Sequence, residues 1–175
     1  MLMSGGKDST YVLYQLVQMG LSPLVFTLDN GYISDQAKGN IRRVCEHLGV
    51  EHVFATSTHM KAIFVDSLNR HCNVCNGCFK TIYTLSMQLA QERRIKYIVT
   101  GLARGQLFET RLTEELFLDP NFDVDRIDQQ IMEARKAYHR QQDLIAETLS
   151  GVTFATDAIF DEIEFVDFYR YTDVE

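Results

Sequence analysis

The sequence predicts an α/β protein whose core is a doubly wound, mostly parallel sheet with crossover helices. Short apolar segments alternate with longer amphipathic segments over roughly the first 100 residues. This alternation is typical of parallel strands joined by crossover helices. The 46% hydrophobic content fits one globular domain, and no apolar stretch approaches the roughly 18 to 20 residues that a membrane-spanning helix needs.

The first expected elements flank a glycine-rich turn. A short first strand, Leu2–Met3, leads directly into Ser4-Gly5-Gly6. A helix is expected over 8–19 because apolar residues recur there at helical spacing, and Gly20 ends it. The apolar run at 24–28 then has the length and composition of a buried strand.

The next helix is expected between two caps, Ser34 at its start and Gly49 at its end. Its inward face includes Cys45, which we assign to the core because free cysteine is mostly buried. The residues 52–55 form a third expected strand, and 60–68 form another amphipathic helix.

A cysteine-rich loop over 71–78 separates that helix from the next one, expected at about 79–92. A fourth strand follows at 97–100. After it, 125–149 has a sparse apolar stripe that predicts a long polar helix, and 163–168 predicts a last strand.

We therefore expect an α/β core over 1–105 and a helical extension over 106–175 that belongs to the same domain. The first strand is shorter than the usual five or six residues. No terminating signal marks the last residues, so we expect the chain to be cut at both ends.

The segment Ser4-Gly5-Gly6-Lys7-Asp8-Ser9 has the chemistry of a phosphate-binding loop. Two glycines allow a tight turn with bare N–H groups, and the following helix adds its positive end. A carboxylate at Asp8 would repel phosphates unless Mg²⁺ bridges them. The glycine spacing is neither that of the Walker A loop nor that of the dinucleotide fingerprint. Further donors are Ser4, Ser9, Thr10 and the cation of Lys7.

This hexapeptide resembles the PP-loop of the N-type ATP pyrophosphatases. That superfamily includes GMP synthetase, asparagine synthetase, NAD synthetase, tRNA thiolation enzymes and N-acetyl sugar amidotransferases. The resemblance covers roughly residues 1–105 and implies an adenine nucleotide alpha hydrolase-like fold that binds ATP and Mg²⁺. It implies that Lys7 and Asp8 act in catalysis. The nucleotide site that it implies comprises Ser4, Gly5, Gly6, Lys7, Asp8, Ser9, Thr10, Leu28, Asp29 and Gly101.

The resemblance also implies a reaction class. ATP would be cleaved to AMP and pyrophosphate to adenylate a carbonyl-like oxygen. A sulfur nucleophile or ammonia would then displace AMP. Such chemistry needs positioning and charge stabilisation rather than a catalytic triad.

Three of the four cysteines, Cys72, Cys75 and Cys78, follow a Cys-x₂-Cys-x₂-Cys pattern. In a chain without a secretion signal, this clustering favours metal binding. Two metals remain open. An iron–sulfur cluster on three thiolates would leave one iron for a sulfur atom, whereas structural Zn²⁺ would take as its fourth ligand His71 or a residue beyond the expected cut end of the chain.

Three functional hypotheses follow. The first is ATP-dependent sulfur insertion with a metal-bearing cysteine cluster. The second is an ammonia-using amidotransferase or synthetase that holds structural zinc and works with a separate glutaminase. The third is a nucleotide-binding regulatory or remnant module without turnover.

The charge balance and the residues after the fourth strand bear on the acceptor. The net charge of −7 argues against a broad nucleic-acid-binding face. Thiolation enzymes usually follow this strand with Gly-His and an acidic pair, but this chain has Gly101-Leu102-Ala103-Arg104. We therefore favour a small-molecule acceptor over tRNA, with a sulfur donor or a glutaminase as partner and a homodimer as a possible state. The N-terminus lacks signal-peptide features, so a cytoplasmic location without membrane contact is expected.

Overall fold

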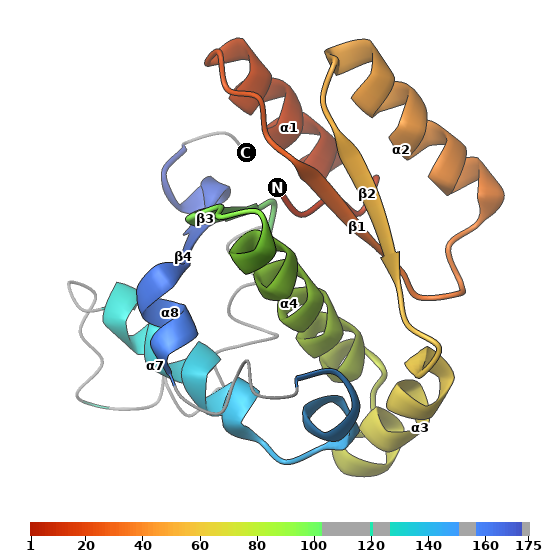
Figure 1. Cartoon of the computed structure of the whole chain (residues 1–175), viewed down its shortest axis with the longest axis vertical. Helices are drawn as coiled ribbons and strands as arrows, with labels where there is room; N and C mark the ends of the chain where they lie inside the picture. Colours follow the sequence, from red (N-terminus) through yellow and green to blue (C-terminus); the bar gives the residue numbers. More distant parts are fainter. Residues whose placement is uncertain (103–119, 121–126, 151–156, 173–175) are drawn as a thin grey trace.

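A computed structural model describes residues 1–102, 120, 127–150 and 157–172. In these ranges, helices and short strands follow one another along the chain, with α3 and α4 consecutive (Figure 1). The elements are α1 Lys7–Gln18, β1 Val25–Asp29, α2 Asp35–Leu48, β2 His52–Thr56, α3 Met60–His71, α4 Cys75–Glu92, β3 Tyr97–Thr100, α7 Ile127–Arg140, the π-helical turn η2 Ala146–Ser150, α8 Ala158–Glu162, β4 Glu164–Asp167 and the 3₁₀ turn η3 Phe168–Arg170.

The strands form two parallel pairs, β1 with β2 and β3 with β4. The N-terminal segment makes backbone hydrogen bonds to both pairs. The N–H of Met3 donates to the carbonyl of Phe26 in β1, and the N–H of Leu2 donates to that of Val99 in β3, each at 2.9 Å. The expected first strand is present as a single parallel bridge between Leu2 and Phe26. The fold is thus a mixed α/β arrangement with small parallel sheets.

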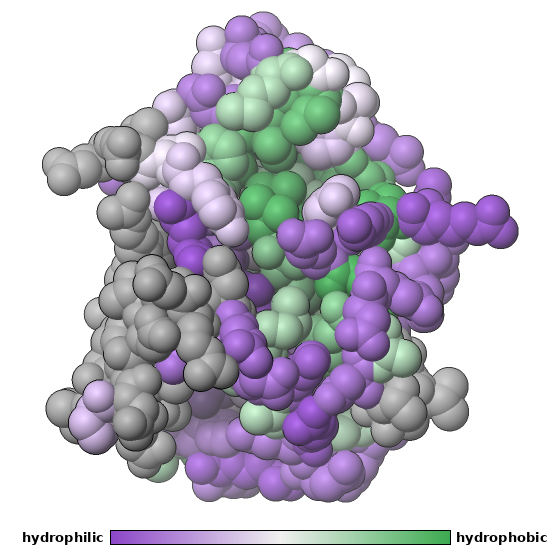
Figure 2. All heavy atoms as spheres, turned by 90° about the vertical axis from the view of Figure 1, so that its left-hand side faces the viewer, coloured by the Kyte–Doolittle hydropathy of each residue, from purple (hydrophilic) through white to green (hydrophobic). Residues whose placement is uncertain are grey.

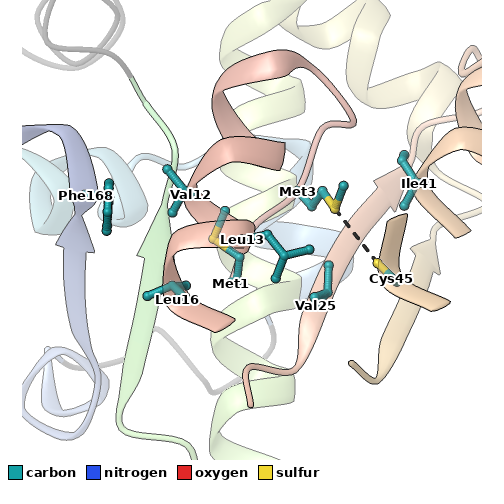
Figure 3. Packing of buried hydrophobic residues seen from close by; sticks show 9 residues of the cluster. All are labelled: Met1, Met3, Val12, Leu13, Leu16, Val25, Ile41, Cys45 and Phe168. Carbon is teal, nitrogen blue, oxygen red and sulfur yellow. Dashed lines mark hydrogen bonds between the residues drawn. The ribbon is translucent and has the colours of Figure 1, made fainter. Parts of the chain in front are cut away.

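Helices pack against both faces of β1 because successive side chains of a strand point to opposite sides. Val25 is buried with side chains of α1 and α2, as Figure 3 shows. Phe26 and Leu28 are buried on the other face with α3. Cys45 is a core residue as predicted, at 2% exposure, and its thiol lies 4.0 Å from the sulfur of Met3.

Two boundaries around the cysteines differ from the prediction. α3 continues to His71, and α4 begins at Cys75 rather than near Phe79. Asn76-Gly77 is therefore part of a helix and not a tight turn. A Cβ at Gly77 would lie 2.9 Å from the Cβ of Ser67, so this glycine lets α3 and α4 approach closely.

The expected long helix over 125–149 is also divided. α7 ends at Arg140, and the Asp143 carboxylate accepts the N–H of Ala146 at 2.9 Å at the start of a new turn. The buried ammonium of Lys80 binds both the Gln141 carbonyl, at 2.8 Å, and Asp143, at 2.7 Å. These tertiary contacts interrupt the helix. Residues 103–119 and 121–126, which include Arg104, lie outside the described part of the chain.

Hydrophobic residues gather in a band on the side of the molecule seen in Figure 2, with hydrophilic residues around it. One groove of about 290 Å³ lies at the amino ends of β1 and β3, and none of the described residues in its lining has a charged side chain. Among the described residues, no helix combines the length and apolar character required to cross a bilayer.

Candidate functional site

A cavity of about 390 Å³ lies at the carboxyl ends of β1 and β3. This volume is in the usual range for small-molecule sites, and the carboxyl ends of parallel strands are where α/β folds bind ligands. Its wall is formed by the loop before α1, the ends of the two strands and one side of α4. Seven predicted site residues line it: Ser4, Gly6, Asp8, Ser9, Leu28, Cys78 and Gly101.

The loop before α1 is held by its own serines. The hydroxyl of Ser9 accepts the N–H of Ser4 at 3.3 Å and lies 3.2 Å from the Ser4 hydroxyl. Gly5 has φ +79°, and a Cβ there would lie 2.7 Å from Cγ1 of Ile41. A glycine is required at this turn, both for its backbone conformation and for the space beside α2.

The first turn of α1 presents unused backbone donors. The N–H groups of Lys7, Asp8 and Ser9 have no acceptor in the described part of the chain. Gly6 is the N-cap and offers no capping side chain. The helix start therefore combines bare N–H groups with the positive end of the helix dipole, which is the environment that binds a phosphate.

Among the described residues that line this cavity, Asp8 alone is charged. Its carboxylate makes no hydrogen bond or ion pair with another described residue, whereas its backbone carbonyl accepts the phenol of Tyr169 at 3.1 Å. A carboxylate beside unused N–H groups at a helix start has the chemistry of a magnesium ligand. Gly5, Lys7 and Thr10 do not line the cavity, and Lys7 is exposed.

Asp29 does not line the cavity either. Its carboxylate binds the ammonium of Lys38 on α2 at 2.6 Å and accepts the N–H of Gly31 at 3.0 Å. The hydrogen bond from Lys38 lowers the pKa of Asp29. The neighbouring Leu28 does line the cavity. Of the two predicted site residues at the end of β1, Leu28 therefore lies at the cavity and Asp29 binds α2.

Gly101 lies against the first turn of α1. A Cβ at this position would be 2.9 Å from Cα of Ser9, so only glycine fits without displacing the backbone. The end of β3 is thus packed directly on the loop that the sequence predicted for phosphate binding.

The predicted cysteine segment over 71–78 is divided by the helix boundaries. Cys72 ends α3 with φ 55°, and both Cys72 and Cys75 are exposed. Cys78 lies one turn into α4 and lines the cavity, where its sulfur accepts the side-chain amide of Asn30 at 3.7 Å. Burial raises the pKa of the Cys78 thiol, against the lowering effect of that hydrogen bond.

The described residues contain no group of three or more His, Cys, Asp or Glu side chains placed to hold a metal ion. The predicted metal ligands Cys72, Cys75 and Cys78 therefore do not converge in this conformation, because two of them face solvent and one faces the cavity. An iron–sulfur cluster or a zinc ion does not fit the donor set as it stands, and we derive no step through one.

Sequence reasoning did not single out several residues of the wall, among them Asn30, Phe79 and Tyr83. Asn30 follows β1 directly, and its position at a strand end was a usable signal. Phe79 and Tyr83 could not be found, because the prediction placed the start of their helix too late and left its cavity-facing side undefined.

No family model matches the chain, and no solved structure matches it. A curated relative, 7-cyano-7-deazaguanine synthase from Psychromonas ingrahamii (strain DSM 17664 / CCUG 51855 / 37), is 45% identical over 49 residues. The alignment covers 28% of this chain and 22% of that protein. The relative is an enzyme of the PP-loop ATP pyrophosphatase family, so the match supports the superfamily for this chain.

Proposed function

We propose that this chain is the nucleotide-binding part of a PP-loop ATP pyrophosphatase with a doubly wound sheet. It binds ATP with Mg²⁺ at the start of α1 and uses it to adenylate an oxygen of an acceptor. The observation that carries this proposal is the start of α1, where the unused N–H groups of Lys7, Asp8 and Ser9 adjoin a cavity of about 390 Å³. The partial match to an ATP-using synthase supports it independently.

The doubly wound sheet rests on two features of the fold. The N-terminal segment hydrogen-bonds to both β1 and β3, which would place it at the centre of a single parallel sheet. Buried side chains of helices pack on both faces of β1. The cavity then lies where the strand order would reverse, at the carboxyl ends of the strands.

In the proposed reaction, an oxygen of the acceptor attacks the α-phosphorus of ATP and the bond to pyrophosphate breaks. The acceptor now carries AMP as a good leaving group. A nucleophile adds to the activated carbon, and AMP departs with the oxygen. The helix start would stabilise the phosphate charge, and Asp8 would hold Mg²⁺, which neutralises the leaving pyrophosphate.

We propose ammonia as the nucleophile. The relative is named for a product that carries a cyano group, so its synthesis introduces or retains nitrogen at carbon. The separated cysteines do not favour a sulfur-bearing cluster. A protein partner with glutaminase activity and a small-molecule acceptor would complete this function.

Sulfur insertion is the second candidate, and one observation favours it. The thiol of Cys78 lines the same cavity as Asp8 and the helix start. A sulfur carried there would be close to the activated acceptor. Burial holds the pKa of this thiol above its ordinary value, which lowers the thiolate fraction and makes Cys78 a weaker nucleophile near neutral pH.

The decisive experiment is product analysis. Radiolabelled ATP is incubated with the protein, Mg²⁺, ammonium and candidate acceptors, and the nucleotides are separated. AMP with pyrophosphate is the expected outcome. ADP with phosphate would contradict the proposal and indicate a kinase-like site. ATP binding without any cleavage across acceptors would favour the non-catalytic module instead.

A further inference from the structure

A buried polar chain connects the cavity to the C-terminal part of the molecule. The hydroxyl of Thr100, which lines the cavity, donates to one carboxylate oxygen of Asp167 at 2.7 Å. The guanidinium of Arg135 on α7 donates to the other oxygen at 2.7 Å. Asp167 is 3% exposed and Arg135 is 4% exposed, so both charges are removed from water and depend on each other.

The position of Arg135 is itself defined by packing. Its guanidinium lies over the ring of Phe165, 4.6 Å from the centroid, and 5.9 Å from the centroid of Tyr83, which lines the cavity. Its Nε has no hydrogen-bond partner among the described residues. A terminal nitrogen of the guanidinium makes the contact with Asp167. The two rings and the carboxylate together fix the orientation of Arg135.

Thr100 transmits this constraint to the phosphate loop. The next residue, Gly101, is packed so closely on Ser9 that an added Cβ would lie 2.9 Å from Cα of Ser9. Ser9 in turn holds Ser4 through its hydroxyl. A movement of the Thr100 backbone would therefore displace the start of α1, where the unused N–H groups lie.

A second contact from the same C-terminal segment reaches α1. The phenol of Tyr169, two residues after Asp167, donates to the backbone carbonyl of Asp8 at 3.1 Å. Phe168 between them is buried against α1. The turn after β4 thus contacts the first turn of α1 directly, while Asp167 acts on it through Thr100.

We propose that Asp167, held by Arg135, is a positioning residue of the nucleotide site. Its carboxylate fixes the Thr100 hydroxyl and, through Gly101, the start of α1 in the geometry that receives the ATP phosphates. The proposal rests on the function proposed above. It assigns a role in ATP binding to α7 and β4, which lie outside the segment that resembles the PP-loop family.

The test measures the dissociation constant of MgATP by calorimetry on the full chain. Thr100→Val removes the hydroxyl and keeps the shape, and we expect it to weaken ATP binding about tenfold, a typical size for residues that act through a neighbour. Thr100→Ser keeps the hydroxyl and should bind within about twofold of the wild type. Failure of serine to restore binding would overturn the proposal.

Two controls separate positioning from loss of stability. Thr84→Val makes the same change at a buried hydroxyl that has no hydrogen-bond partner among the described residues and does not line the cavity. Ile98→Val lowers stability within β3 itself but leaves the polar chain intact. Both should bind MgATP as the wild type does. If Ile98→Val weakened binding as much as Thr100→Val, the effect would be one of stability and the proposal would fail.

A double-mutant cycle tests Asp167 itself. Asp167→Asn should weaken ATP binding, and the Thr100→Val/Asp167→Asn protein should bind no more weakly than Thr100→Val alone, because both changes break one path. Additive losses would overturn the proposal. If Asp167→Asn does not fold, Asp167→Glu takes its place in the same cycle, because it keeps the negative charge beside Arg135 and displaces the carboxylate from the Thr100 hydroxyl. A wild type that binds no MgATP would instead contradict the proposed function.

Discussion

α1 and α4 both bring their N-terminal turns to the cavity, and the two helices begin differently. At α4, the side-chain oxygen of Asn73 accepts the N–H of Asn76 at 3.0 Å, and the hydroxyl of Ser67 accepts that of Gly77 at 2.9 Å. At α1, the N–H groups of Lys7, Asp8 and Ser9 have no acceptor in the described part of the chain. The protein uses donors at the start of α4, whereas the N–H groups of Lys7, Asp8 and Ser9 remain unused among the described residues.

The difference comes from the chain just before each helix. Gly5, with φ +79°, turns the backbone so that Ser4 contacts the hydroxyl of Ser9, and none of the residues 1–6 accepts an N–H of Lys7, Asp8 or Ser9. α4 is preceded by a short connection from α3, and the close packing at Gly77 places α3 side chains over its start. A helix dipole alone is therefore insufficient for an anion site, because the N–H groups must also remain unused.

The largest expected effect tests the charge at the start of α1. Asp8→Ala should lower pyrophosphate release by at least about a hundredfold, because loss of a magnesium ligand removes several kcal/mol of transition-state stabilisation. The unfolding midpoint should change little, because the carboxylate has no partner among the described residues. Pyrophosphate release and thermal unfolding measure the two quantities.

Asp35→Ala is the matched control, since Asp35 is also an acidic residue in the first turn of a helix, α2, and does not line the cavity. It should lose only the small dipole interaction of roughly 0.3–1 kcal/mol and retain full activity. Unchanged pyrophosphate release in Asp8→Ala would remove the distinction between the two helix starts.

Glycines near the starts of α1 and α4 should differ in what their substitution affects. Gly5→Ala forces a side chain into a left-handed backbone beside Ile41 and should abolish detectable ATP binding. Gly77→Ala crowds α3 and should lower the free energy of unfolding by about 1–3 kcal/mol without changing the ATP affinity of the folded protein. Calorimetry and chemical denaturation distinguish the two outcomes.

Gly39→Ala provides the control for these substitutions. It lies inside α2, where an added Cβ would meet no described residue other than its neighbours in the helix, so alanine should stabilise the protein by about 0.5–1 kcal/mol. A Gly77→Ala protein that also loses ATP binding would mean that the start of α4 contributes to the phosphate site after all.

Sequence patterns predicted those parts of the molecule that depend on local spacing. The cap of α2 at Ser34, the core position of Cys45 and the loop before α1 all depend on residues close in sequence. The start of α4 was misplaced because Ser67 and Asn73 stabilise it only once α3 lies beside it. Asp167 could not be found at all, since it is 67 residues from Thr100 and its role depends on the pairing of β3 with β4.

The smallest expected effect concerns the cysteines of the α4 segment, which serve as internal controls for one another. Cys72 and Cys75 are exposed, whereas Cys78 lines the cavity and has a pKa raised by burial. Because the thiolate is the reactive form, iodoacetamide should modify Cys78 several-fold more slowly than the other two near neutral pH. Its relative rate should rise as the pH increases, since a raised pKa delays ionisation to higher pH.

MgATP should slow the modification of Cys78 further and leave that of Cys72 unchanged, because only Cys78 shares a wall with the proposed nucleotide site. Peptide mass spectrometry resolves the rates. The comparison also bears on the metal hypothesis, since a shared ion would protect all three thiols together and would do so without ATP. Equal protection of Cys72 and Cys78 from alkylation, lost when a chelator is added, would show that the segment rearranges around a metal. The arrangement in which Cys72 is exposed and Cys78 lines the cavity would then not be the resting state of the protein.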